Sequence, residues 1–151
     1  RTLHETGVDP AGIIFEITES AAVVDATDSA RMLTELARMG CRIALDDFGT
    51  GYSSLSYLTQ LPIHGIKIDR SFLTDAPGNQ ESEALIAAIS AMARALRLST
   101  TVEGIESQAQ LQFLQSLGLN RLQGYFFSKP IDSVAMTRLL ETGLPDEKFQ
   151  H

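Results

Sequence analysis

The sequence predicts an α/β fold with a parallel sheet. Short apolar runs rich in β-branched residues alternate along the chain with longer segments of helical periodicity, and this alternation is typical of βα units. A second observation is that the apolar runs end in charged or amide residues. In parallel α/β folds the carboxyl ends of the strands share one face, which holds the active site. The pattern therefore predicts both the fold class and the place where functional groups gather.

Five apolar runs are predicted to be buried strands, because each is short, rich in β-branched residues and bounded by turn residues. In chain order they are GIIFEIT (12–18), CRIALD (41–46), GIKID (65–69), STTVE (99–103) and the weaker NRLQGYFF (120–127). No linker or low-complexity tract separates them. One domain, or part of a larger one, is therefore expected.

Helices are predicted between these strands. In chain order they cover 28–39, 81–98, 107–117 and a last segment that begins at Asp132, and residues 2–6 resemble the tail of an earlier helix. Gly40 and Gly118 follow two of these segments, and glycine is the residue most often found just after a helix. The helical segments thus have the boundaries that crossover connections between parallel strands require.

Composition narrows the classes of partner. The 151 residues include 19 Asp and Glu against 12 Lys and Arg, which gives a formal net charge of −7. The sequence has no run of basic residues that could bind along a nucleic-acid backbone, and this argues against polymeric DNA or RNA as a partner. The single cysteine, Cys41, favours a reducing compartment. No apolar stretch of 18 residues predicts a membrane span in this segment. We expect a cytoplasmic protein, or the cytosolic part of a membrane-anchored one.

Polar residues stand at or just after the carboxyl end of each predicted strand. They are Glu16 and Glu19, Asp46 and Asp47, Lys67 and Asp69, Glu103 and Glu106, and Gln123. Because parallel strands end at one edge of the sheet, we expect these side chains to converge. Carboxylates that converge repel one another unless a cation neutralises them. Oxygen ligands without a cysteine or histidine set favour Mg²⁺ or Mn²⁺ over zinc or copper.

Each of these residues also has a structural interpretation. Glu16 or Glu19 alone is typical of the start of a helix, and Asp46 with Asp47 is typical of a turn before FGTG. Lys67 lies between isoleucines in a strand, a position that lysine seldom takes unless it lines a cleft. For Lys67 a functional role is therefore favoured.

Five motifs taken together resemble the EAL phosphodiesterase family. They are FEITES (15–20), DDFGTGYSSL (46–55), IKIDRSF (66–72), TVEGIES (101–107) and LQGYFFSKP (122–130), in the order and approximate spacing of that family. The resemblance implies a TIM-type (β/α)₈ barrel that hydrolyses cyclic di-GMP to linear pGpG with Mg²⁺ or Mn²⁺. It covers essentially the whole chain.

The resemblance also implies an incomplete barrel. Residues 1–151 correspond to the C-terminal portion of an EAL domain, with about five of its βα units, while the N-terminal strands are missing. The signature Glu-Ala-Leu and an asparagine metal ligand would fall before Arg1. We expect the 151 residues alone to be inactive, because an open barrel exposes unpaired edges. A second chain, or self-association as a homodimer through the 48–55 loop or the barrel edge, would cover them.

Roles follow from the resemblance, residue by residue. Glu16 corresponds to a metal-ligand glutamate, Asp46 to the aspartate that contacts or bridges the metals, and Asp47 to a second-metal ligand, with the two ions about 3.5–4 Å apart. Lys67 corresponds to the lysine that holds the attacking water, and Glu103 to a general base or a second-metal ligand. The remaining matches are Glu106 and Gln123, which line the site, Glu19, which braces the 48–55 loop, and the weaker match Asp69.

Two functions of different classes stay open at this point. The first is metal-dependent hydrolysis of cyclic di-GMP. The second is a regulatory module that binds the nucleotide or a partner protein without hydrolysing it. A different metal-using barrel enzyme, such as an enolase-like one, shares the acidic strand ends but does not account for FEITES and LQGYFFSKP together.

Overall fold

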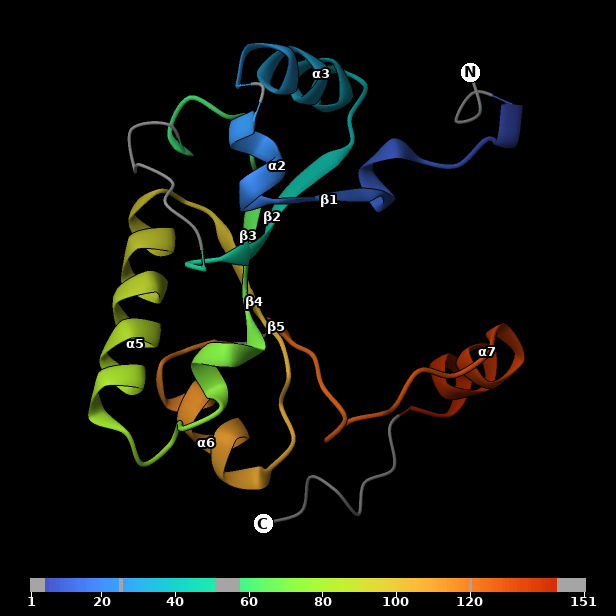
Figure 1. Ribbon diagram of the computed structural model, residues 1–151. Helices are drawn as coiled ribbons and strands as arrows, with labels where there is room; N and C mark the ends of the chain where they lie inside the picture. The colour runs from blue at the N-terminus through green and yellow to red at the C-terminus, as the bar shows by residue number, and fades with distance from the viewer. Residues whose placement is uncertain (1–4, 25, 51–57, 120, 144–151) are drawn as a thin grey trace.

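A computed structural model describes residues 5–24, 26–50, 58–119 and 121–143. It contains one sheet of five parallel strands, and each strand lies beside the next one in the chain (Figure 1). The strands are β1 Ile14–Thr18, β2 Arg42–Phe48, β3 Gly65–Ile68, β4 Ser99–Val102 and β5 Arg121–Leu122. The α/β class with a parallel sheet is therefore confirmed.

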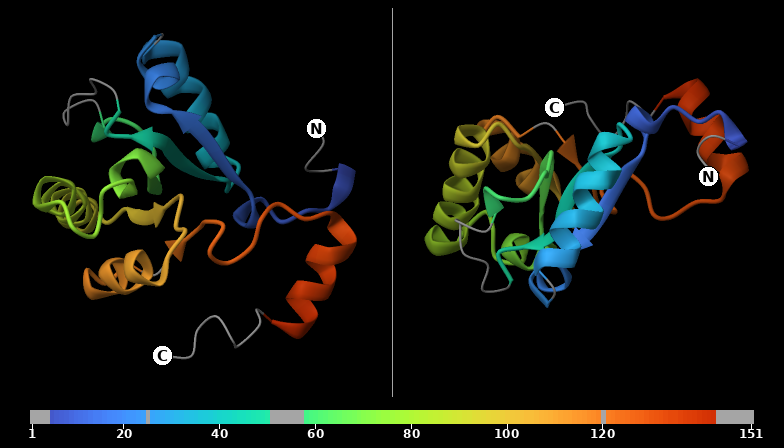
Figure 2. Two further views of the ribbon diagram at one scale, coloured as in Figure 1. Left: turned by 60° about the horizontal axis from the view of Figure 1, so that its bottom comes forward. Right: turned by 90° about the horizontal axis from the view of Figure 1, so that it is seen from above.

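The described helices lie between β1 and β2, between β3 and β4, and between β4 and β5, with one before β1 and one after β5. They are α2 Glu19–Val24, α3 Ala26–Arg38, α5 Gln80–Ala95, α6 Gln108–Ser116 and α7 Ser133–Thr142, with short 3₁₀ helices η1 Pro10–Gly12 and η2 Arg70–Leu73. In Figure 2, α3, α5 and α6 follow one another around the outside of the strands. Right-handed crossovers that always advance in one direction place every helix on the same side of the sheet. This is the arrangement of a (β/α) barrel and not of a doubly wound sheet.

The core lies between the helices and the outer face of the sheet. Alternate residues of the central strands face it, because side chains alternate along a strand. The strand residues that face the core are Ile43, Leu45, Ile66, Ile68 and Val102, each no more than 1% exposed. The helix residues that pack among them are Leu33, Ile86, Ala93, Leu111 and Leu114. The apolar side chains buried between the helices and the outer face of the sheet hold the strands in place.

The opposite, inner face of the sheet is far more polar. A hollow there is lined by Glu16 and Lys67 and by small residues at neighbouring positions of the central strands, namely Ala44, Gly65, Ser99 and Thr101. The register places Ala44 beside Gly65, Gly65 beside Ser99, and Lys67 beside Thr101. The strand residues that line this hollow therefore face away from the core.

The weak fifth strand differs from the prediction. Only Arg121 and Leu122 form β5, although the apolar run extends to residue 127. Beyond Leu122 the chain turns against the segment after β4: the Ile105 N–H donates to the Gln123 carbonyl at 3.1 Å, and the Phe126 N–H donates to the Ile105 carbonyl at 2.9 Å. Phe126 and Phe127 of this run pack against the core, which explains why the run is apolar without being a strand.

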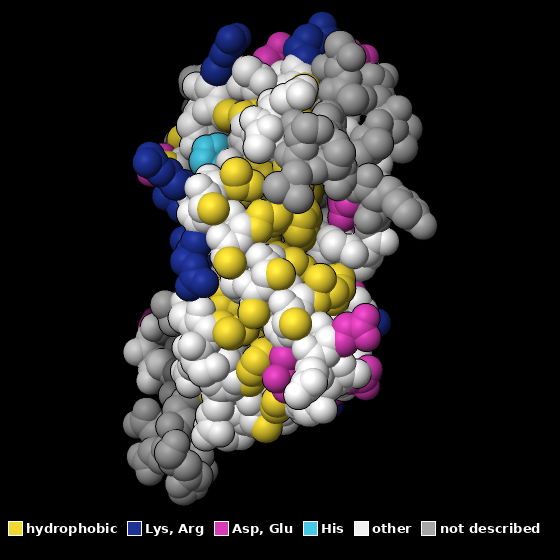
Figure 3. Space-filling model, turned by 90° about the vertical axis from the view of Figure 1, so that its left-hand side faces the viewer, with side chains coloured by type: hydrophobic (Ala, Val, Ile, Leu, Met, Phe, Trp, Pro, Cys, Tyr) yellow, Lys and Arg dark blue, Asp and Glu magenta, His cyan; other side chains and the backbone are white. Residues whose placement is uncertain are grey.

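Two surfaces remain apolar. Helix α7 stands apart from the sheet (Figure 1), and its Val134 and Leu140 are each 78% exposed. Figure 3 faces the side where α5 lies and shows hydrophobic side chains down its centre. None of the helices in the described ranges is both long and apolar enough to cross a membrane.

Candidate active site

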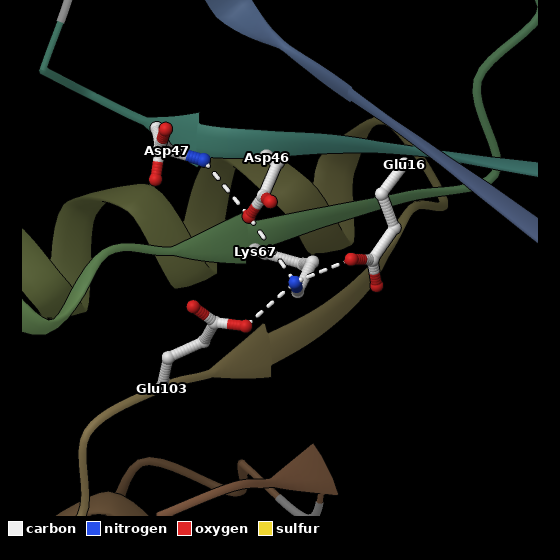
Figure 4. A network of polar contacts seen from close by, with 5 residues as sticks. All are labelled: Glu16, Asp46, Asp47, Lys67 and Glu103. Atoms are coloured by element: carbon white, nitrogen blue, oxygen red, sulfur yellow. Dashed lines mark hydrogen bonds and ion pairs between the residues drawn. The ribbon is translucent and has the colours of Figure 1, made fainter.

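Four charged side chains meet on the inner face, at the carboxyl ends of four successive strands (Figure 4). Lys67 of β3 lies at the centre and is 8% exposed. Its ammonium Nζ is 2.7 Å from Glu16 Oε2, 3.2 Å from Asp46 Oδ1 and 2.6 Å from Glu103 Oε1. Residues from β1, β2 and the first position after β4 thus each contribute one carboxylate. We call these four residues the Lys67 cluster.

Strand alternation and register bring this cluster together. Ile66 and Ile68 are buried in the core, so the lysine between them points to the inner face. Leu45 is also buried in the core, which turns Asp46 to the same inner face. Glu16 of β1 lies beside Ala44 of β2. The small side chain of Ala44 leaves room for the glutamate to extend across β2 to the lysine on β3.

The Lys67 cluster holds one positive and three negative charges. Burial alone would lower the pKa of the Lys67 ammonium, but the hydrogen bonds that it donates to Glu103, Glu16 and Asp46 outweigh this effect and raise the pKa above its ordinary value. Lys67 therefore stays protonated at neutral pH. The ammonium is the charge that keeps three mutually repelling carboxylates within reach of one point.

Asp47 lies outside this cluster. Its backbone φ is 53°, a left-handed conformation that aspartate tolerates better than most residues. Its N–H donates to Asp46 Oδ1 at 3.0 Å, and Figure 4 shows its carboxylate apart from the Lys67 ammonium. The residue expected as a second-metal ligand is thus close in sequence to the cluster but is not brought into it.

Glu19 contacts the turn after β2 and not the cluster. This glutamate, at the start of α2, is 3% exposed, and its Oε2 accepts a hydrogen bond from the Gly49 N–H at 3.0 Å. The bond joins α2 to the first residues of the 48–55 loop. The rest of that loop, 51–55, lies outside the described residues.

Phe72 packs on the other side of the same turn, a role that the sequence did not indicate. Gly49 has φ +96°, and a Cβ at this position would lie 2.8 Å from Phe72 Cζ. Glycine is required here both by the backbone conformation and by the ring. The turn after Asp46 and Asp47 is therefore in contact both with the Glu19 carboxylate and with an aromatic ring of η2.

Asp69 acts at the start of η2. Its carboxylate accepts a hydrogen bond from the Ser71 N–H at 3.0 Å. Hydrogen bonding from Ser71 lowers the pKa of Asp69 below its ordinary value, against the opposing effect of burial. This geometry is that of an N-cap, so Asp69 fixes the chain that leaves β3.

Glu106 and Gln123 follow β4 and β5 in the chain, and both are exposed. The ion pairs that the structure gives Lys67 within the described residues involve neither of them. Glu106 lines a cleft between the βα connections that follow β3 and β4, together with Arg70, Gly104 and Gln110. The backbone N–H of Gln123 donates to the Val102 carbonyl at 2.9 Å.

Gln110 is a positioning residue that sequence reasoning missed. Its Oε1 accepts from the N–H groups of Glu106 (2.8 Å) and Ser107 (3.1 Å), and its Nε2 donates to the Leu73 carbonyl at 3.0 Å. The loop after β4 is thereby tied to η2. Ser107 and Gln110 form a capping box, and the S-x-x-Q spacing is the signal that could have identified it.

The donor set suits a hard divalent cation, although no metal site is preformed. Among the described residues, no group of three or more His, Cys, Asp or Glu is arranged so that it could hold a metal ion. Three carboxylate oxygens nevertheless lie within 3.2 Å of one atom, Lys67 Nζ. Carboxylate oxygens are the ligands that Mg²⁺ and Mn²⁺ prefer. Glu16, Asp46 and Glu103 therefore fit such an ion by chemistry and by proximity.

Fold and site together define a (β/α)-barrel type of domain with an acidic centre at the carboxyl ends of its strands. The family model of the EAL domain matches residues 1–130. The chain belongs to the EAL domain family. The sequence resemblance on which this expectation depended is thus confirmed.

Relatives of known name and structure agree with this assignment. The chain is 44% identical over 124 residues to the bifunctional diguanylate cyclase/cyclic di-GMP phosphodiesterase MucR of Pseudomonas aeruginosa, covering 82% of this chain and 18% of MucR. A MucR phosphodiesterase structure in complex with c-di-GMP superposes with a TM-score of 0.84 at 42% identity, covering 89% of this chain and 54% of that one. Klebsiella pneumoniae BlrP1, in a manganese and cyclic di-GMP complex, gives 0.80 at 31% identity, with 85% and 33% covered.

The matched region is a small part of most relatives. The chain spans 17%, 18% and 16% of the length of three curated relatives. What those whole proteins do therefore applies to this chain only as a proposal.

Proposed function

We propose that this chain contributes the acidic centre of an EAL domain that hydrolyses cyclic di-GMP to linear pGpG with a divalent cation. The observation that carries the proposal is the convergence of Glu16, Asp46 and Glu103 on Lys67. Relatives named as cyclic di-GMP phosphodiesterases, such as PdeR of Escherichia coli at 38% identity over 138 residues, supply the substrate. The manganese in the BlrP1 complex supports a divalent ion, and we propose Mg²⁺ or Mn²⁺, two ions in all.

Glu16 and Asp46 would hold the ions, with Asp47 as a further ligand. A bound divalent cation supplies Lewis acidity and neutralises the charge of a phosphodiester. The Lys67 ammonium donates a hydrogen bond to the attacking water or to a phosphoryl oxygen, and adds positive charge beside the phosphorus. Glu103 accepts the proton that this water loses.

The bond changes follow from these positions. The water oxygen forms a bond to phosphorus, the phosphorus–O3′ bond of the cyclic dinucleotide breaks in line with it, and the departing O3′ takes up a proton. One turnover consumes one water and opens the ring. Gln123 and Glu106 would contact the nucleotide, and Glu19 would act indirectly through the Gly49 turn.

We also propose that residues 1–151 form the C-terminal portion of the domain. Within the described residues, β1 pairs only with β2 and β5 only with β4, so each end of the sheet offers an edge to a further parallel strand. The chain covers 54% of the MucR phosphodiesterase chain, which supports the view that more strands complete the barrel. Homodimer formation through 48–55 or through these edges stays a prediction.

A hydrolysis assay tests the function. The full-length protein that contains this chain is incubated with cyclic di-GMP and Mn²⁺, and pGpG is separated by chromatography. Glu103→Gln is expected to lower turnover by about 10²-fold or more, whereas Glu35→Gln, a change on the exposed face of α3, is expected to leave turnover unchanged. Tight nucleotide binding without hydrolysis by the wild-type protein would refute the enzyme and support the regulatory alternative.

A further inference from the structure

We propose that Lys67 is a built-in counter-ion that competes with the divalent cation for the same carboxylate oxygens, and so sets the affinity of the site for metal. This inference rests on the proposed function, because it requires a divalent cation to be a ligand of the Lys67 cluster. It gives Lys67 a role before catalysis, separate from its contact with water or phosphate.

The first support is the saturation of the ammonium. A lysine ammonium has three N–H donors, and the structure gives it three carboxylate acceptors, at 2.6, 2.7 and 3.2 Å. With an exposed fraction of 8% for the residue, water has little access to replace any of them. All three N–H donors of the ammonium are thus engaged by the carboxylate oxygens of Glu16, Asp46 and Glu103, which are also the candidate ligands of the cation.

The second support is a mismatch of distances. The three oxygens surround Nζ at hydrogen-bond lengths, whereas Mg²⁺ holds oxygen ligands at about 2.0–2.1 Å. Ammonium and cation cannot share the centre, since both are positive and both need the same oxygens. Metal binding therefore requires the carboxylates to close in and the ammonium to withdraw.

The third support is the room beside the lysine. The hollow on the inner face is lined by Lys67, by the small residues Ala44, Gly65, Ser99 and Thr101, and by larger residues at the amino ends of the strands, among them Ile14, Arg42 and Arg121. The flexible four-carbon stem of a lysine can shift within such a space. A shift of this kind would take the ammonium out of the centre of the three carboxylates.

Mn²⁺ titration by calorimetry tests the inference on the protein used for the hydrolysis assay. Lys67→Met removes the competing charge and keeps the length of the side chain. It is expected to bind Mn²⁺ at least about tenfold more tightly than wild type, and to melt at a lower temperature without metal. Saturating Mn²⁺ should remove most of that difference in melting temperature. Lys129→Met, a lysine change at an exposed position outside the Lys67 cluster, is the matched control and is expected to leave the affinity for Mn²⁺ unchanged.

The outcomes separate this inference from the proposed function. Equal or weaker Mn²⁺ binding by Lys67→Met, with measurable binding by wild type, would overturn the inference and leave the metal-dependent function intact. No Mn²⁺ binding by either protein would overturn both. Lys67→Arg, which keeps the charge, should bind Mn²⁺ like wild type, and tenfold tighter binding by Lys67→Arg would overturn the inference. If Lys67→Met does not fold without metal, Lys67→Gln replaces it in the same titration.

Discussion

Removing the Glu19 carboxylate should loosen the turn that carries the acidic pair. Glu19 is 3% exposed, and its Oε2 accepts from the Gly49 N–H at 3.0 Å. A hydrogen bond to a charged group contributes about 1.5–3 kcal/mol. Because Gly49 is itself exposed, water can replace part of the lost bond in Glu19→Ala, and the lower half of this range, about 1.5–2 kcal/mol, is expected.

That loss of stability is large enough to measure. For a protein of this size a change of 1 kcal/mol lowers the melting temperature by about 2–4 °C, so Glu19→Ala should melt about 3–8 °C below wild type in a circular dichroism scan. Glu19→Gln keeps an oxygen acceptor and should lose less. The control is Glu35→Ala on the exposed face of α3. If Glu19→Ala melts with the control, the Glu19–Gly49 bond does not hold the turn.

Three further predictions concern the site and its support. Asp46→Asn should weaken Mn²⁺ binding in a calorimetric titration, and unchanged affinity would argue against its role as a ligand. Gly124→Ala should lower the free energy of unfolding by about 3 kcal/mol, since a Cβ there would overlap the Ile105 backbone, and an unchanged urea midpoint would contradict this packing. The pKa of Asp69 is lowered in the folded protein, so its contribution is present above the unfolded value near 3.8 and is lost as pH falls through the folded value. Wild type should therefore be more stable than Asp69→Asn at neutral pH, and this difference should shrink only at about that pH and below; a difference that stays constant through the acid range would refute this.

The sequence determined the class of fold and the chemistry of the site. Residues 65–69 and 99–103 were predicted as strands and the structure has β3 and β4 there, because periodicity and residue type act locally. The same local signals placed a carboxylate or a lysine at each strand end. They did not reveal α2, a short helix that begins directly after β1, or the early end of β5.

Only the tertiary structure decided which of these groups meet. Lys67 reaches Glu16, Asp46 and Glu103 because three strands set their register around β3. Asp47, one residue from Asp46, is turned out of the cluster by a backbone φ of 53°, and Asp69 is engaged in capping η2. Residue types are fixed by the chain alone, whereas distances between side chains on different strands depend on register, twist and turns, which arise only when the strands pack together.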